Sequence, residues 1–187
     1  MYKRQAPTSI AASENVYTLG INLSGTPNGA EVVGVTPVAT SIYDAVGNVS
    51  VTEQSGNTAN LKDKASPIFS ALDLANNNGT IAVTFSEPIF SKSDGTGALD
   101  SLDFTFSLAG AGATLSQANP RTITKNGNVY TLGIGLDGTP SGAEVLTISP
   151  AADAIFDASG NVAQTNQALK TKTCLLYTSD AADDHHR

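Results

Sequence analysis

The sequence predicts an all-β chain that folds as antiparallel β-sandwiches, and three observations lead to this fold class. Short apolar runs alternate with polar residues, and no stretch sustains the i, i+3, i+4 spacing of a helix. Turn residues such as Gly, Asn and Pro separate these runs. The third observation is a long internal repeat, from which we expect the chain to be a piece of a tandem-repeat protein.

Residues 15–49 and 128–162 are two versions of one sequence, displaced by 113 residues and identical at 23 of 35 positions. Such a period exceeds the roughly 20–50 residues of a solenoid repeat and suits an array of whole domains. We therefore expect a complete copy at residues 65–172, preceded by the C-terminal half of another copy at 6–63. After residue 49, Leu61 matches Leu169 at an offset of 108, which predicts five extra residues around 53–57 in the first copy.

Both ends of the chain, residues 1–5 and 174–187, match nothing in the repeat. Codons back-translated from CLLYTSDAADD and YKRQ resemble a transposase adapter and its reverse complement. We interpret these ends as sequencing-adapter artefacts on a metagenomic fragment and exclude them from the fold. The remainder has seven Lys and Arg, fourteen Asp and Glu, and no Cys, Met, Trp or His.

Alternation and turn signals then predict the individual strands. Ile81, Val83 and Phe85 alternate with smaller residues, which is typical of a strand with one buried face. Asn126-Gly127 tolerates the positive φ of a tight hairpin, so the runs on either side of it should pair antiparallel. Further turns are predicted at 137–142 and 157–161. The expected strands are 67–72, 80–85, 104–108, 113–116, 122–125, 129–136, 143–149 and a last one within 161–171.

Seven or eight short strands in about 100 residues are typical of an immunoglobulin-like sandwich. The Cys…Trp…Cys pattern of antibody domains is absent. Because the first copy lacks the first three or four strands, its inner face should be open to water. We expect poor cover over Tyr17, Leu19, Ile21 and Leu23, and no stable fold for residues 6–63 alone.

Four segments together resemble a known family: VTFSEPIF (83–90), DF (103–104), YTLGIGLDGTPSGAEVLTISP (130–150) and DASGN (157–161). In this order they are similar to bacterial Ig-like repeats of large secreted, surface-layer or adhesin-type proteins. The resemblance implies a sandwich used as a spacer or display module, an extracellular or cell-surface location, and no catalysis. It also implies neighbouring repeats as partners, and some members of the family bind calcium between domains.

Few catalytic or nucleic-acid-binding features are present. Without His or Cys outside the chain ends, Ser-His-Asp and Cys-His sites are excluded. The candidate carboxylates for glycosidase chemistry, which we expect on solvated strand ends and turns, are Glu31, Glu87, Glu144 and Asp157. Scattered Lys and Arg disfavour nucleic-acid binding, and no apolar run is long enough for a membrane helix. We expect no enzyme and no organic cofactor.

Calcium is the sharper hypothesis, because carboxylate and amide oxygens are its preferred ligands. Asp157 and Asn161 flank one turn, Asp44 and Asn48 repeat the arrangement, and Glu87 ends a strand. Asp94, Asp100 and Asp103 gather in one loop. The alternative, which we favour, is that Asp157 caps its turn while Asn161 adopts the left-handed conformation, since the spacing fails the EF-hand pattern.

Two function classes follow. The first is a non-catalytic spacer repeat. The second is an Ig-like module that recognises a cell-surface carbohydrate or protein through loops such as 91–102, with or without calcium. We favour the spacer, because the sequence contains no aromatic cluster suited to a ligand.

Overall fold

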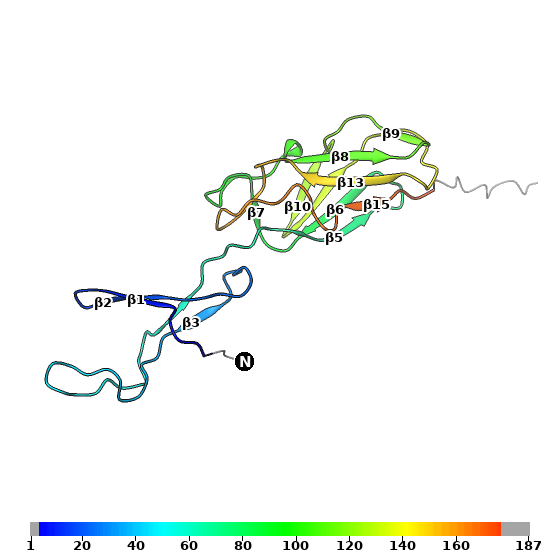
Figure 1. Cartoon of the computed structure of the whole chain (residues 1–187). Coiled ribbons are helices and arrows are strands. Elements are labelled where there is room, and N and C mark those ends of the chain that lie inside the picture. Colours follow the sequence, from blue (N-terminus) through cyan, green and yellow to red (C-terminus); the bar gives the residue numbers. More distant parts are fainter. Residues whose placement is uncertain (1–3, 177–187) are drawn as a thin grey trace, which may run out of the picture. The chain divides into compact units, whose positions relative to one another are not determined.

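The computed structural model describes residues 4–176, and these form two compact units that are divided between Ala65 and Ser66. All strand pairs in the described residues are antiparallel, and the only helical element there is the 3-10 turn Ser101–Asp103. The predicted all-β class is therefore confirmed, and the antiparallel sheets are arranged in a sandwich-like way (Figure 1).

The second unit, as described over residues 66–176, contains two main sheets. The first has the order β10-β11-β6-β5 and the second β15-β13-β8, while β12-β9 and β14-β7 form short extra pairs. The bounds are β5 Phe69–Leu74, β6 Thr80–Phe85, β7 Ile89–Phe90, β8 Phe104–Ala109, β9 Ala113–Leu115, β10 Ile123–Asn126, β11 Val129–Gly133, β12 Leu136–Gly138, β13 Val145–Pro150, β14 Phe156–Asp157 and β15 Thr171–Thr173.

The core of the second unit lies between these sheets, because the alternate residues of each strand face inward. Phe85 stands at its centre and makes edge contacts with Phe69, Phe104 and Tyr130, at ring-centroid distances of 5.1, 6.3 and 5.8 Å. Fully buried aliphatic side chains from both sheets complete it: Ile81, Val83 and Leu132 from one, Leu146 and Ile148 from the other.

The predicted hairpin is present, since Asn126 pairs with Val129 and the strands continue in register to Ile123 and Leu132. Its two loop residues are Gly127 and Asn128, and Gly127 supplies the positive φ, 58°. The expected single strand at 129–136 is wrong. The chain changes partner there, pairing with β6 as β11 and with β9 as β12.

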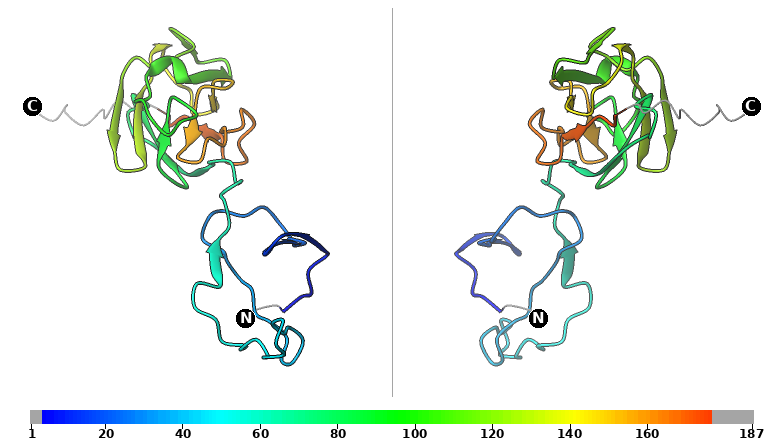
Figure 2. Two further views of the ribbon diagram at one scale, coloured as in Figure 1. Left: turned by 90° about the vertical axis from the view of Figure 1, so that its left-hand side faces the viewer. Right: turned by 90° about the vertical axis from the view of Figure 1, so that its right-hand side faces the viewer.

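Within residues 4–65 the first unit has four short strands: β1 Ser9–Ser13, β2 Val16–Gly20, β3 Val32–Gly34 and β4 Thr58–Asn60. They form two separate pairs, β1-β2 and β3-β4, joined by long stretches without regular structure. In Figure 2 the first unit follows an open course, whereas the strands of the second unit are layered. The expected lack of cover is observed: Tyr17 is 65% exposed, Ile21 42% and Leu23 47%, with Leu19 half-buried.

Equivalent backbone pairs occur in the two units, and their residue numbers always differ by 113. Val32 pairs with Asn60, and 113 residues later Val145 pairs with Thr173. The amide of Leu61 donates to the carbonyl of Glu31 at 2.8 Å, and that of Cys174 donates to Glu144 at 2.8 Å. The predicted 108-residue offset and the five extra residues at 53–57 are therefore wrong; the match of Leu61 with Leu169 is a chance similarity.

The final strand continues beyond residue 172, where we expected the second copy to end. Cys174 is buried, with 4% of its surface exposed, at the position that Leu61 takes in the first unit. The side chain of Asn78 donates to the carbonyl of Leu175 and accepts from its amide, both at 2.8 Å. Most of the segment interpreted as an adapter, residues 177–187, and residues 1–3 lie outside the described residues.

Candidate functional site

The two turns proposed as calcium sites have the same hydrogen bonds. In the second unit, Oδ1 of Asp157 accepts from the amides of Ser159 and Asn161, both at 2.8 Å, and Oδ2 accepts from Nδ2 of Asn161 at 2.7 Å. In the first unit, Asp44 accepts from the amides of Val46 and Asn48 at 3.0 and 2.8 Å, and from Nδ2 of Asn48 at 2.7 Å. Both carboxylate oxygens thus already bind protein donors, as the turn-capping interpretation predicts.

One detail of that interpretation is wrong. The left-handed residue is not Asn161 but Gly160, with φ 82°, and its counterpart Gly47 has φ 90°. The asparagine side chain is instead held by the aspartate. A Cβ on Gly160 would also lie 2.7 Å from the carbonyl oxygen of Ser93, so glycine is required there for a second reason.

Burial distinguishes the two turns. Asp157 has no exposed surface, whereas Asp44 is exposed. The hydrogen bond from the Asn48 side chain, followed by that from the Asn48 amide, lowers the pKa of Asp44 below its usual value. The same turn therefore forms with and without a surrounding core, which shows that its structure is local in origin.

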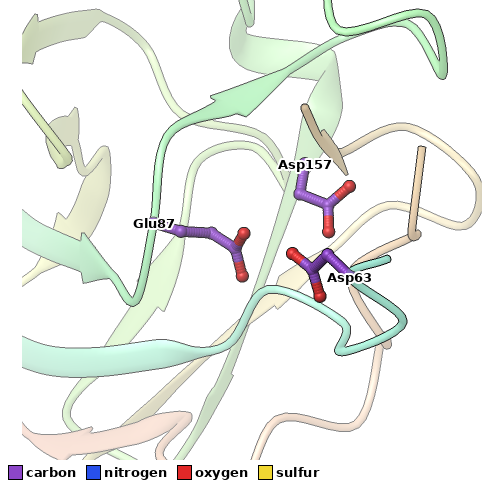
Figure 3. A group of neighbouring side chains, drawn as sticks. All are labelled: Asp63, Glu87 and Asp157. Atoms are coloured by element: carbon purple, nitrogen blue, oxygen red, sulfur yellow. The ribbon is translucent and has the colours of Figure 1, made fainter. Parts of the chain in front are cut away.

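A second carboxylate lies near Asp157. Oxygen atoms of Glu87 and Asp157 lie within 4.8 Å of one another, although 70 residues separate them in the sequence (Figure 3). Glu87 is half-buried in the loop between β6 and β7, and β7 pairs with β14, where Asp157 lies. Asp63, also labelled in Figure 3, belongs to the first unit, where its Oδ1 accepts from the amide of Ala65 at 2.8 Å.

The five predicted ligands therefore do not gather at one place. Glu87 joins Asp157, and Asn161 lies beside Asp157 but uses its amide as a donor. Asp44 and Asn48 form their own turn in the other unit. Two carboxylates supply only part of the six to eight oxygens that calcium takes. Chemically, the pair could contribute two ligands to a cation site.

The acidic loop before β8 is organised by its own carboxylates. Asp100 caps the 3-10 turn by accepting from the amide of Leu102 at 2.7 Å, and Asp103 accepts from the amide of Asp100 at 2.8 Å. Burial raises the pKa of Asp103. Asp94 accepts from the amide and hydroxyl of Thr96; the hydroxyl contact, the larger cause, lowers its pKa. These side chains hold the loop together rather than facing a common ligand position.

Sequence reasoning missed the environment of Glu144, which we expected to be a solvated acid. Glu144 is fully buried. Its carboxylate accepts from the Ser141 amide and hydroxyl, the Gly142 amide and the Gly112 amide, at 2.8–3.2 Å. Hydrogen bonds, above all from the Ser141 backbone, lower its pKa to about 2. The repeated string GAEV carried a signal: a charged residue between apolar ones in both copies.

Comparison of the chain with protein-family models, with curated proteins and with solved structures found no match. In the part of the chain that the structure describes, no helix has the length and apolar character needed to cross a membrane.

Proposed function

We propose that this chain is a non-catalytic spacer segment, with immunoglobulin-like topology, of a large bacterial secreted or cell-surface protein of the adhesin type. The observation that carries the proposal is the double correspondence between residues 15–49 and 128–162. The sequences match at a spacing of 113, and the backbone hydrogen bonds recur at that same spacing. A sequence that recurs with the period of a whole domain is suited to setting a distance.

The chemistry of the loops supports a passive role. Asp157, Asp100 and Asp103 stiffen their own turns, and Glu144 ties the loop at Ser141 to Gly112. Every buried side-chain nitrogen and oxygen of the described residues has a hydrogen-bond partner. Polar groups that satisfy one another rigidify a domain, which is useful in a spacer, and they leave few donors aimed at a ligand.

Pulling the full chain in a single-molecule force experiment tests the spacer role. A spacer must bear load as one cooperative element, so we expect a single rupture. The released length should match residues 66–176 at about 3.3–3.6 Å per residue. Gradual extension without a rupture peak would contradict a load-bearing role.

A ligand-binding module, with calcium as a possible requirement, is the alternative, and the proximity of Glu87 and Asp157 favours it. Calorimetric titration of the full chain with Ca²⁺ separates the two functions. The alternative expects heat that disappears in Glu87→Gln, with surface glycans or proteins bound only in the presence of calcium. The spacer expects neither heat nor binding on a glycan array, with or without calcium.

A further inference from the structure

In the second unit, the C-terminal half of the domain holds the N-terminal half through a few specific groups. Tyr130 packs on Phe85, at 5.8 Å between ring centroids. Oε1 of Gln167 accepts from the amide of Phe69 at 2.9 Å. The amide of Ile134 donates to the carbonyl of Gly79 at 2.8 Å. These contacts link residues 119–176 to residues 66–118.

The first unit retains the groups that make those contacts. At the spacing of 113, Tyr17 corresponds to Tyr130, Ile21 to Ile134 and Gln54 to Gln167. Glu31 corresponds to Glu144, whose Oε1 accepts from the amide of Gly112 at 2.8 Å. The described residues of the first unit contain no counterpart of residues 66–118.

Two of these side chains are already held in the orientation that binds the other half. Nε2 of Gln54 donates to the carbonyl of Val51 at 2.7 Å, as Nε2 of Gln167 donates to Gln164 at 2.6 Å. Oε2 of Glu31 accepts from the amide of Asn28 at 3.0 Å, as Oε2 of Glu144 accepts from Ser141 at 2.9 Å. Preorganised groups of this kind lower the ordering cost of binding.

A hollow of about 310 Å³ lies beside Gln54, lined by Val35, Pro37, Ser50, Gln54, Ser55, Gly56 and Asn57. In the second unit the counterparts of Val35, Ser50 and Gln54 are Ile148, Ala163 and Gln167, all buried. The backbone of Phe69 is bound to Gln167 there, and its side chain belongs to the same core cluster as Ile148 and Ala163. The hollow thus corresponds to the place where β5 begins in the complete domain.

Strand β2 also has an edge without a neighbour. Its counterpart β11 lies between β10 and β6, whereas β2 pairs with β1 alone among the described residues. Its apolar face is open: Tyr17 is 65% exposed and Tyr130 only 2%. An open edge beside an apolar face is the surface onto which an added strand docks.

We propose that residues 6–65 form a docking surface for the N-terminal half of a repeat, a polypeptide with the sequence of residues 66–118. The strand corresponding to β6 adds antiparallel to β2, so that the Ile81 position faces Leu19, as Ile81 faces Leu132. The strand corresponding to β5 places its first residue at Gln54. This inference goes beyond the spacer role, because complementation holds whether the completed domain sets a distance or binds a ligand.

A second copy of the chain is a poorer occupant of this surface. Its own residues 66–118 are covered by its own C-terminal half, and their aromatic side chains are buried there. Exchange of that segment between chains would uncover as much apolar surface as it covered. The occupant must therefore be a segment without a partner of its own.

A fusion that places residues 66–118 directly before Ala6 of the chain tests the proposal, because Ala6 is the counterpart of Asn119, which follows residue 118. Hydrogen exchange at the amide of Ile21 is the readout, and the amide of Ile134 is the internal standard. We expect Ile21 in the fusion to exchange at least about 100-fold more slowly than in the parent chain. Unchanged exchange at Ile21 in a soluble fusion would overturn the proposal. If the fusion is insoluble, the same readout applies to the parent chain mixed with excess polypeptide 66–118.

Matched variants distinguish docking from nonspecific collapse. Gln54→Ala in the fusion should speed exchange at Ile21, as Gln167→Ala speeds it at Ile134, whereas Glu53→Ala at a neighbouring exposed position should have no effect. If the amide of Ile21 were protected equally in the Gln54→Ala fusion and in the unsubstituted fusion, the proposed position of the β5 strand at Gln54 would be overturned. If the parent chain sedimented as a dimer and its Ile21 amide were protected from exchange, the occupant would be a second copy of the chain, and the proposed occupant would be overturned.

Discussion

The first and second units have the same turns and nearly opposite burial. Ile42 is 53% exposed, whereas its counterpart Ile155 is fully buried. The same backbone hydrogen bond nevertheless forms in both units. The amide of Ser50 donates to the carbonyl of Ile42, and the amide of Ala163 donates to the carbonyl of Ile155, both at 2.8 Å. Turn residues and short-range hydrogen bonds thus establish the local structure of each unit. The hydrophobic core, which supplies most of the stability, needs strands from both halves of a domain.

Replacing the equivalent tyrosines Tyr17 and Tyr130 in turn should give the largest difference in stability. Tyr130→Ala deletes a buried ring that contacts Phe85 and Phe104, so we expect a loss of about 3–5 kcal/mol in the free energy of unfolding. Tyr17→Ala deletes a ring that is 65% exposed and should leave chemical denaturation of the second unit unchanged. Equal losses in the two variants would contradict the exposure of Tyr17 and its independence from the core of the second unit.

Glu144, the counterpart of Glu31, should make the stability of the second unit sensitive to acid. The folded-state pKa of Glu144, about 2, lies below the ordinary value of 4.5. Its contribution to stability is therefore complete above pH 4.5 and is lost as the pH falls towards 2. Denaturation midpoints between pH 2 and 7 should fall less steeply with acid in Glu144→Gln than in the parent chain, while Glu31→Gln follows the parent. A parallel pH profile for Glu144→Gln would contradict this assignment.

A smaller contrast is expected at the turn aspartates. Asp157→Ala removes a fully buried carboxylate that accepts hydrogen bonds from the amides of Ser159 and Asn161, which should cost about 1–3 kcal/mol in thermal unfolding of the second unit. In Asp44→Ala, water can replace the lost acceptor because Asp44 is exposed, so the unfolding of the second unit should not shift. The comparison would fail if Asp157→Ala also had no effect.

The hairpin turns should give the smallest effect. Gly127 and Glu14 occupy the same position with φ 58° and 54°, a conformation that costs a residue with a Cβ about 1–2 kcal/mol. We expect Gly127→Ala to destabilise the second unit by about 1 kcal/mol. Conversely, Glu14→Gly should slow exchange at the amides that join β1 and β2, as measured by NMR. Faster exchange there would indicate that the Glu14 side chain stabilises the turn.

Sequence predicted those parts of the fold that depend on local pattern. Strict alternation correctly placed the strand at 80–85, and turn chemistry correctly made Asp157 an acceptor. Strands β7 and β14 were missed, because two residues are too few to show a period. The last strand was predicted too early in the sequence, because Leu61 was aligned with Leu169. Its true position, Thr171–Thr173, is set by antiparallel pairing with β13.

The candidate site was harder to predict because burial depends on residues far apart in the sequence. Glu87 and Asp157 meet through the pairing of β7 with β14, which no local pattern reveals. Glu144 looked like a surface acid because its donors come partly from Gly112, 32 residues upstream. A buried carboxylate is recognised only when the donors that replace its water are known.

The side chain of Asn78 makes the end of the last strand more tolerant of substitution than the hydrophobic core is. Its amide group binds the backbone of Leu175 as a neighbouring strand would, so the last segment is held through atoms that every amino acid except proline possesses. The identity of the residue there is consequently almost free to vary. Substitutions at Leu175 should therefore leave the pairing of β15 with β13 undisturbed, whereas loss of the Asn78 amide group should loosen it.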